Sequence, residues 1–238
     1  MRKMNGSGSY LKNQVRKNLA KAVLCLFLFC LIVFLVGLNV VFALTSEVFD
    51  AAGLFVSLVP LAAFYFYLRK YRIYNGGWAG EKQVTKLLSS RLNDDYVLLN
   101  DLYLRNGAGD IDHIVLGPSG IFVLETKNWS GEITCRGDEW ERSGRHNFKA
   151  SPSLQVKRNT AKIRLIIDSS PVLKLPGVWV EGILVFTNNH STLHLNNPTV
   201  PVLKLPQLVN HITSQRSSSV LTPQQLETIG KEILKQKN

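Results

Sequence analysis

A long apolar block constrains this chain more than any other feature. Between Ala22 and Leu68 there is no lysine or arginine, and the only acidic residues are Glu47 and Asp50. The block accounts for much of the skew in composition, in which 45% of the 238 residues are hydrophobic and only 19% are charged. Such a skew is unusual for a soluble protein, whereas the rest of the chain reads as ordinary globular sequence.

The block divides into two candidate membrane spans. The first, Ala22 to Leu44, is apolar on every helical face and exceeds the roughly 20 residues that one crossing requires. A polar turn, Thr45 to Asp50, leads to the second, Ala51 to Leu68, whose Pro60 a membrane helix tolerates as a kink. A cleaved signal peptide and a buried helical hairpin are the alternatives. The first span is longer than the apolar region of a typical signal peptide, about 7 to 15 residues.

Basic residues flank both ends of the block. Residues 1–21 hold six lysines and arginines and no acid, and the second span ends in an aromatic and basic run made of Tyr65, Tyr67, Arg69, Lys70, Tyr71 and Arg72. The positive-inside rule then places both flanks in the cytosol. We expect an inner (cytoplasmic) membrane protein with two transmembrane helices in contact with lipid, and with both termini and the C-terminal domain in the cytosol.

Four parts are expected along the chain: a basic cytosolic tail at 1–21, the hairpin at 22–68, a glycine-rich linker at 69–80 and a globular domain at 81–238. Residues 69–238 hold 22 of the 28 basic and 15 of the 17 acidic residues, so this part is itself basic. A basic domain favours a polyanionic partner, although many soluble domains are simply basic. The three cysteines, Cys25, Cys30 and Cys135, provide neither a disulfide framework nor a zinc pattern.

Apolar periodicity in the globular part predicts a mixed α/β domain. The expected helices are 81–92, 153–168, with Ser151 and Pro152 at its start, and 222–235. The expected strands are 96–104, 110–116, 121–126 and 179–187, with turns at 107–109 and 117–120, a further strand and turn at 131–142, and a polar loop through Asn147. The hexapeptide PVLKLP occurs at 171–176 and 201–206, where it predicts two extended segments without a function.

The segment from Gly109 to Gly131, GDIDHIVLGPSGIFVLETKNWSG, carries the chemistry. If its two strands pair across the turn at 117–120, Asp112 lies near the start of one strand and Glu125 near the end of the next. Two-residue alternation puts Glu125 and Lys127 on one face. Carboxylates of this kind suit Mg²⁺ or Mn²⁺, and a lysine beside them can neutralise a phosphate and orient or deprotonate a water molecule.

The order of Asp112, Glu125 and Lys127 resembles the D…ExK signature of the PD-(D/E)xK nuclease superfamily. With Gly80, Glu81 and Gln155, residues 77–186 are similar to the nuclease-related domain called NERD. The resemblance implies a restriction-endonuclease-like mixed sheet flanked by helices, a metal held by Asp112, Glu125 and Glu81, and a catalytic set that adds Lys127 and Gln155. The proline that names the superfamily is absent, since Ile111 precedes Asp112.

Each of these residues also has a structural explanation. Glu81 could be an acid favoured near a helix N-terminus, Asp110 a turn residue, and Lys127 a surface lysine. Alternation turns His113 to the opposite face from Asp112, as a structural histidine. Trp129 and Trp140 could stack on bases or pack in the core.

Basic side chains gather on and before the helix that carries Gln155. They are Arg136, Arg142, Arg145, Lys149, Lys157, Arg158, Lys162 and Arg164. Such charges serve phosphate contact or a solvated surface equally well.

The expected function is a membrane-anchored, Mg²⁺-dependent nuclease that acts on nucleic acid, with DNA preferred to RNA. The rival is a catalytically silent module that binds nucleic acid or a protein partner at the membrane. A scaffold that uses only its basic charge against lipid would leave the carboxylates unexplained.

Overall fold

The computed structural model describes residues 1–4, 10–42, 47–104, 110–143, 151–173, 177–215 and 220–236. The chain forms two compact units. One is helical and comprises Ser9–Trp78, whereas the other is globular and comprises Met1–Gly8 together with Ala79–Asn238. The globular unit is therefore discontinuous in sequence, because the helical unit is inserted after residue 8.

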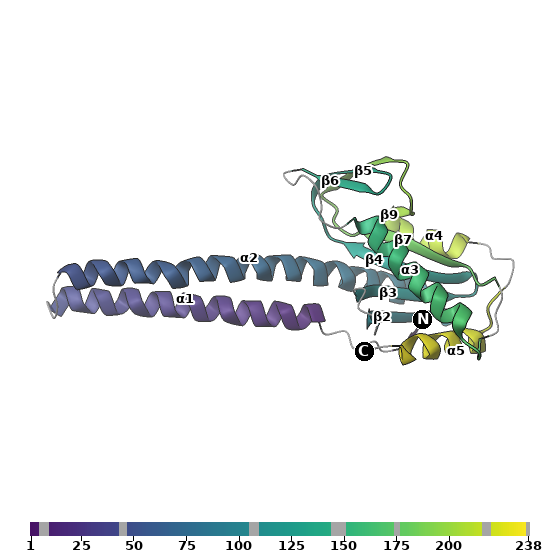
Figure 1. The fold of residues 1–238 in the computed structure, drawn as a ribbon, viewed down its shortest axis with the longest axis horizontal. Helices are drawn as coiled ribbons and strands as arrows, with labels where there is room; N and C mark the ends of the chain where they lie inside the picture. The colour runs from purple at the N-terminus through teal and green to yellow at the C-terminus, as the bar shows by residue number, and fades with distance from the viewer. Residues whose placement is uncertain are drawn as a thin grey trace. The chain divides into compact units, whose positions relative to one another are not determined.

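The helical unit is an antiparallel hairpin of α1 (Tyr10–Phe42) and the first part of α2 (Glu47–Arg91), which lie side by side in Figure 1. Gly53 allows the two helices to approach closely, since a Cβ at this position would lie 2.6 Å from Val36 Cγ2. Most large apolar side chains of the hairpin point outward. Both helices are long and apolar enough to cross a membrane, as the sequence predicts.

The glycine-rich stretch at 69–80 is helical, so the expected linker conformation is wrong. It forms the middle of α2, and the predicted helix at 81–92 is the last part of the same helix, ending at Arg91. A glycine costs about 1 kcal/mol relative to alanine inside a helix. Tertiary packing commonly outweighs that cost: Gly77 lies against Leu11 in the hairpin, and Gly80 lies against Thr187 and Asn128 in the globular unit.

Within the described residues, the globular unit contains a six-stranded mixed sheet in the order β1-β2-β3-β4-β7-β9. Its strands are β1 (Arg2–Met4), β2 (Val97–Tyr103), β3 (Asp110–Gly117), β4 (Gly120–Lys127), β7 (Val180–Phe186) and β9 (Val202–Lys204). The central pairs β2–β3 and β3–β4 are antiparallel, whereas β1, β7 and β9 each pair with a parallel neighbour. A smaller sheet joins β6 (Glu139–Arg142), β5 (Gly131–Arg136) and β8 (Ser191–Asn196).

Helices cover both faces of the large sheet, as Figure 1 shows. One face packs against the last turns of α2, through Val84 and Leu88, and against Leu92 just after the helix. The same face also packs against α4 (Leu208–Ser214), which follows the short 3₁₀ helix η1 (Leu205–Gln207). The other face packs against α3 (Pro152–Ser169) and α5 (Pro223–Lys235). The mixed sheet flanked by helices confirms the predicted fold class.

Several sequence predictions are confirmed closely. Four predicted strands each match one observed strand to within one residue at either end, namely 96–104, 110–116, 121–126 and 179–187. The strand and turn predicted at 131–142 form β5 and β6. Ser151 caps α3 and Thr222 caps α5 through their side-chain oxygens. The second PVLKLP copy supplies β9 and begins η1. Some predictions lie outside the described residues: the turn at 107–109, the loop at 144–147, Arg145, Lys149 and part of the first PVLKLP copy.

The expected basic tail at 1–21 is not a separate segment. Arg2–Met4 forms β1, which pairs in parallel with β2, and residues from Tyr10 onward belong to α1. Met4 packs against the core, and the Arg2 backbone nitrogen donates to the Tyr96 carbonyl at 3.0 Å. A three-residue strand is too short for periodicity to reveal it.

Candidate functional site

The site begins where β3 and β4 separate. Their ladder runs from Gly117↔Gly120 to His113↔Leu124. Beyond it, the Thr126 backbone N–H donates to Asp112 Oδ2 at 2.6 Å, so a side-chain carboxylate takes the place of a backbone acceptor. The end of the ladder fixes Asp112 beside the last residues of β4.

Glu125 and Lys127 come from the end of β4, on the face that packs against α3. The Lys127 ammonium donates to Glu125 Oε1 at 2.5 Å and to Gln155 Oε1 at 3.4 Å. Glu125 is only 3% exposed, and its Oε2 is buried with no hydrogen-bond partner among the described residues. The structure thus brings together three of the predicted residues and leaves one buried carboxylate oxygen available for a ligand.

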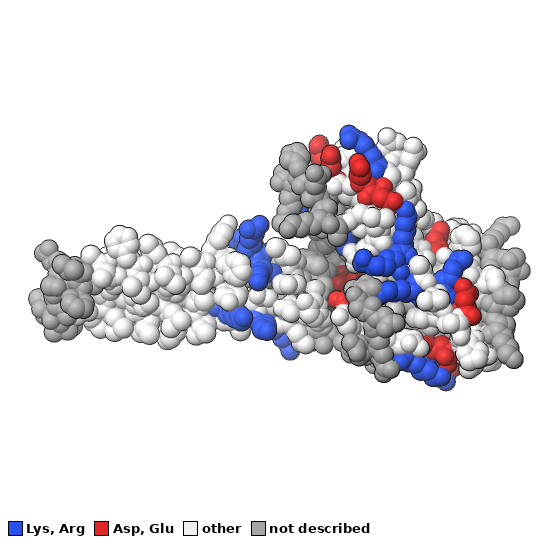
Figure 2. Space-filling model, viewed as in Figure 1, with Lys and Arg blue, Asp and Glu red and all other residues white. Residues whose placement is uncertain are grey.

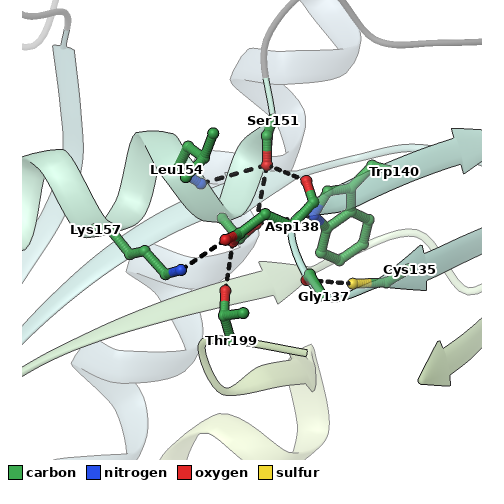
Figure 3. A network of polar contacts seen from close by, with 9 residues as sticks. Cys135, Gly137, Asp138, Trp140, Ser151, Leu154, Lys157 and Thr199 are labelled. Carbon is green, nitrogen blue, oxygen red and sulfur yellow. Dashed lines mark hydrogen bonds and ion pairs between the residues drawn. The ribbon is translucent and has the colours of Figure 1, made fainter. Parts of the chain in front are cut away.

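A polar network fixes the N-terminus of α3 and with it Gln155 (Figure 3). Asp138, in the turn between β5 and β6, accepts hydrogen bonds from Ser153 at 2.7 Å and from Thr199, and pairs with Lys157 at 2.8 Å. These hydrogen bonds lower the pKa of Asp138 to about 2. The Ser151 hydroxyl donates to the Asp138 carbonyl at 2.6 Å and caps the helix. Asp138 therefore stays charged and anchors α3.

Glu81 reaches the site from α2. The residue before it, Gly80, is buried, and a Cβ there would lie 2.8 Å from Thr187 Oγ1 and 3.0 Å from Asn128 Cβ. A glycine is therefore required for α2 to approach the ends of β4 and β7 this closely. The charges of Asp112 and Glu125 both act on Glu81, so the helix brings a third predicted carboxylate within electrostatic range of the other two.

Asp101 is a further carboxylate that the sequence analysis did not single out. The β2–β3 register continues on both sides of it, from Asn100↔His113 to Leu102↔Ile111, and places it opposite Asp112. It has a left-handed backbone, with φ of 50°, which is strained for a residue other than glycine. Its side chain hydrogen-bonds to Glu81. Like charges directly opposite each other destabilise a sheet, and sites of chemistry are where such an arrangement persists.

The alternation of both strands shifts at this point. Leu99 and Leu102 on β2 face the same core, as do Ile114 and Ile111 on β3, although strict alternation would put the members of each pair on opposite faces. The shift falls at Asp101 and Asp112. A sequence pattern of two buried residues separated by two others was the one signal that could have drawn attention to Asp101.

Burial and mutual repulsion raise the pKa values of the clustered acids. Desolvation, followed by the charges of Asp112 and Asp101, raises the pKa of Glu81 to about 9. Burial also raises the pKa of Asp112 well above its ordinary value, with Glu125 adding to the rise. The pKa values of Glu125, Asp101 and Asp110 are raised, chiefly by burial. Such a cluster favours a bound cation, which stabilises the ionised carboxylates.

Lys127 remains a cation in this environment. Burial alone would lower its pKa, but the charges of Glu125 and Asp112 raise it above its ordinary value. A lysine held protonated can neutralise a phosphate and orient a water molecule, but it is a poor proton acceptor at neutral pH. Of the two roles expected for Lys127, its ion pair with Glu125 favours charge neutralisation over deprotonation.

The chemistry of the oxygen donors fits a divalent cation, although their positions do not form a complete cage. Carboxylate oxygens are the ligands of Mg²⁺ and Mn²⁺, and Mg²⁺ usually keeps several water molecules. Within the part of the chain that the structure describes, no group of three or more His, Cys, Asp or Glu side chains stands close enough to hold a metal ion. Asp112, Glu125 and Glu81 thus supply oxygen donors of suitable chemistry, but they are not assembled into a metal site in this structure.

His113 is structural, as alternation predicts. Its Nδ1 lies 2.8 Å from Asn100 Oδ1, and burial lowers its pKa to about 3. An amide oxygen cannot donate, so Nδ1 carries the proton of the neutral ring.

Both tryptophans have core contacts. Trp140 is buried and stacks on Phe186, and Trp129 packs against the same ring edge to face. Trp129 is only half-buried and lies 5.8 Å from the Lys127 ammonium.

Asn159 and Arg158 of α3 also belong to the surroundings of the site. Asn159 is buried and donates to the Asp110 carbonyl at 3.2 Å, which fixes the start of β3. Arg158 acts electrostatically on Glu125. The basic helix expected to contact phosphates thus lies beside the carboxylates.

Residues 76–187 match the family model described as nuclease-related domain, NERD. This range includes Glu81, Asp112, Glu125, Lys127 and Gln155. An uncharacterized protein of Bacillus anthracis is 43% identical over 60 residues, which are 24% of this chain and 28% of that protein. The aligned part is thus little more than a quarter of the relative. No solved structure matches the chain at a significant level.

Proposed function

We propose that the protein is a membrane-anchored, Mg²⁺-dependent nuclease that hydrolyses phosphodiester bonds in DNA, on the premise that residues 76–187 match the family model of the nuclease-related domain. One observation carries the proposal. The Lys127 ammonium pairs with the buried Glu125 and contacts Gln155, and the charges of Asp112 and Glu81 act on the same ammonium. Carboxylates that can bind a cation, beside an ammonium that can bind a phosphate, are expected of a nuclease site.

In this proposal, Asp112, Glu125 and Glu81 would hold the ion, which would supply Lewis-acid stabilisation of charge on the phosphate. Lys127 neutralises a phosphate oxygen in the transition state, where its fixed position makes it effective. Gln155 accepts a hydrogen bond from Lys127 and orients the ammonium towards the phosphate. The basic side chains of α3, including Arg158, bind the phosphate backbone without reading sequence.

The membrane anchor of the proposed nuclease is the hairpin of α1 and α2. Strand β1 lies in the same sheet as β2, although the hairpin separates them in sequence. If the hairpin crosses a bilayer, both of its ends must be on the side that holds this sheet. Together with the basic flanks, this arrangement supports a cytosolic nuclease domain at the inner membrane.

A catalytically silent nucleic-acid-binding module is the second candidate. It is favoured by the 2.5 Å ion pair between Lys127 and Glu125, in which the two charges neutralise each other without a metal ion or a phosphate. In such a module the basic surface would still bind the phosphate backbone, and the carboxylates would no longer bind a metal ion.

The test uses the full chain purified in detergent with DNA and RNA substrates of matched sequence. Cleavage that appears with Mg²⁺ or Mn²⁺ and stops with a chelator supports the nuclease. Salt-sensitive binding without cleavage under any divalent ion would replace it with the silent module, since binding to a phosphate backbone weakens steeply with salt.

A further inference from the structure

Seven exposed basic residues surround one end of the helical hairpin, among the residues that the structure describes. We call them the basic collar: Lys12, Arg16, Lys17 and Lys21 on α1, and Arg69, Lys70 and Arg72 on α2. In Figure 2, Lys and Arg gather on the hairpin at this level, whereas the long stretch beyond them shows no charge. The collar therefore marks a sharp boundary on the hairpin surface.

The register of the hairpin brings the cations of both helices to one level. Lys21 lies over the Tyr67 ring, 5.0 Å from its centre, and Leu11 lies against Gly77. Since the helices are antiparallel, Lys17 is close in height to Tyr71, and so to Arg69 and Lys70. From Lys12 to Lys21 the collar rises by roughly 14 Å at about 1.5 Å per residue.

The collar has no counter-charge in its own unit. The sequence between Ser9 and Trp78 contains only two acids, Glu47 and Asp50. They stand near the start of α2, where Asp50 is roughly 28 Å and Glu47 roughly 33 Å from Arg69 along the helix at about 1.5 Å per residue. No ion pair involves a collar residue among those found in the described part of the chain. The anions that balance these cations must come from outside the hairpin.

Apolar and aromatic surface begins directly above the collar. Val23, Leu24 and Phe27 follow Lys21 and are exposed, and none of the most apolar stretch of α1 is buried within the protein. Tyr65 and Phe66 precede Arg69 and are also exposed, with Lys70 4.5 Å from the centre of the Phe66 ring. Lysine stems that lie along apolar rings while their charges reach polar surroundings are characteristic of a membrane interface.

From these observations we infer that the basic collar is a binding site for the phosphate groups of anionic phospholipids. Headgroups occupy about 5 to 8 Å on each side of the hydrocarbon core, so Lys17, Lys21, Arg69 and Lys70 stand at their level. Because the four lie on continuous helices, the site is held in shape before lipid binds. It rests on the proposed membrane anchoring and is independent of the nuclease chemistry.

The test places the purified full chain in nanodiscs made from an equal mixture of phosphatidylcholine and phosphatidylglycerol. Lipids that remain bound on release are identified by native mass spectrometry. We expect phosphatidylglycerol to be enriched several-fold over phosphatidylcholine on the wild-type protein. The variant Lys17→Gln, Lys21→Gln, Arg69→Gln, Lys70→Gln should lose that enrichment, and replacing Lys17 and Lys21 by Arg while converting Arg69 to Lys should keep it.

A matched control removes the same charge elsewhere, through Lys86→Gln, Arg91→Gln, Lys231→Gln and Lys235→Gln, and should keep the enrichment. Reconstitution in discs separates lipid binding from any effect of the cations on membrane insertion. Equal enrichment for the wild type and the collar variant would overturn the inference. So would a collar variant that keeps its lipid but loses DNA binding in the same discs, because the collar would then belong to nucleic acid. A nuclease that fails to cleave leaves this result unaffected.

Discussion

Lys127 and Glu125 illustrate how the site depends on single charges. The two side chains neutralise each other at 2.5 Å, and the same pair is buried at the point where α3 meets β4. Removing the lysine leaves a buried carboxylate with neither ion nor ammonium. Removing a carboxylate leaves the lysine with Gln155 and relieves repulsion among the remaining acids. The two kinds of substitution should therefore fail in different ways.

Lys127→Ala should keep divalent-ion binding and lose turnover, since the lysine contacts Glu125 and Gln155 and is assigned to the phosphate. Because Glu125 loses its partner, unfolding free energy should fall by about 1–3 kcal/mol. Calorimetric titration of Mn²⁺, denaturant unfolding and single-turnover cleavage check the three effects. Lys86→Ala, at an exposed position of α2, is the control, and its parameters should stay within error of the wild type.

The raised pKa of Glu81 predicts how stability changes with pH. Its ordinary value is 4.5, and in the folded protein it is about 9. The folded state therefore holds this proton where the unfolded state has lost it. The contribution of Glu81 to stability is complete below pH 4.5 and disappears as the pH rises towards 9.

In chelator, the thermal midpoint should thus fall between pH 5 and pH 9, and Glu81→Gln should make the profile flatter. Added Mn²⁺ should raise the midpoint more at the alkaline end, where the carboxylates ionise most readily. Thermal unfolding followed by circular dichroism measures both. A profile that is identical in the wild type and Glu81→Gln would contradict the assigned environment of this residue.

Much of the candidate site could be predicted at residue scale because its signal is local. Asp112, Glu125 and Lys127 lie within sixteen residues of one another in a single hairpin, where alternation and the D…ExK order apply directly. Asp101 was missed for a physical reason. It enters through cross-strand register and a left-handed backbone, and the break in alternation between Leu99 and Leu102 is the one trace that it leaves in the sequence.

At the scale of elements, α2 is the least expected feature. One continuous helix of 45 residues runs from the hairpin into the globular unit and carries Glu81. The composition YNGGWAG indicates a linker, yet tertiary contacts keep it helical. The strands were predicted well because each is a run of apolar residues bounded by turns. β1 and β9, with three residues each, are too short for such a pattern.

Gly80→Ala should disturb the site, because the new methyl group would press on Thr187 and Asn128. Either α2 or the residues at the ends of β4 and β7 must then shift to make room for the methyl group. We expect unfolding free energy to fall by about 1–3 kcal/mol and cleavage to fall at least tenfold as Glu81 moves. Denaturant unfolding and cleavage rates measure the two.

Gly76→Ala provides the matched control four residues earlier in the same helix. A Cβ at Gly76 would meet no atom within 4 Å, so this substitution should stabilise the helix by about 0.5–1 kcal/mol. Equal effects of the two substitutions would show that close approach at Gly80 has no special role.

At the scale of the whole molecule, the sheet bears on topology. Residues 2–4 and 97–103 pair with each other although the hairpin lies between them in sequence. If the hairpin crosses a bilayer, β1 and β2 must lie on the same side of that bilayer. The pairing thus requires a common side for both ends of the hairpin, and charge bias alone predicts that this side is the cytosol.

Reporters fused before Met1 and after Asn238 should therefore both report the cytosol, and a reporter placed in the turn at 45–50 should report the outside. Arg2→Pro, which removes the N–H that donates to Tyr96, should weaken the docking of β1 without reversing the hairpin. Protease cleavage of the globular unit from the periplasmic side would contradict this topology.

Divalent-dependent cleavage tests the central claim most directly. The full chain is incubated with DNA in Mg²⁺, in Mn²⁺ and in chelator, beside Asp112→Asn and Glu125→Gln. The account predicts cleavage by the wild type in either ion, none in chelator, and a loss of at least a hundredfold in both variants, with folding intact. Stability should be equal or higher in Asp112→Asn, where carboxylate repulsion is relieved. Cleavage at the wild-type rate by both variants would contradict the site.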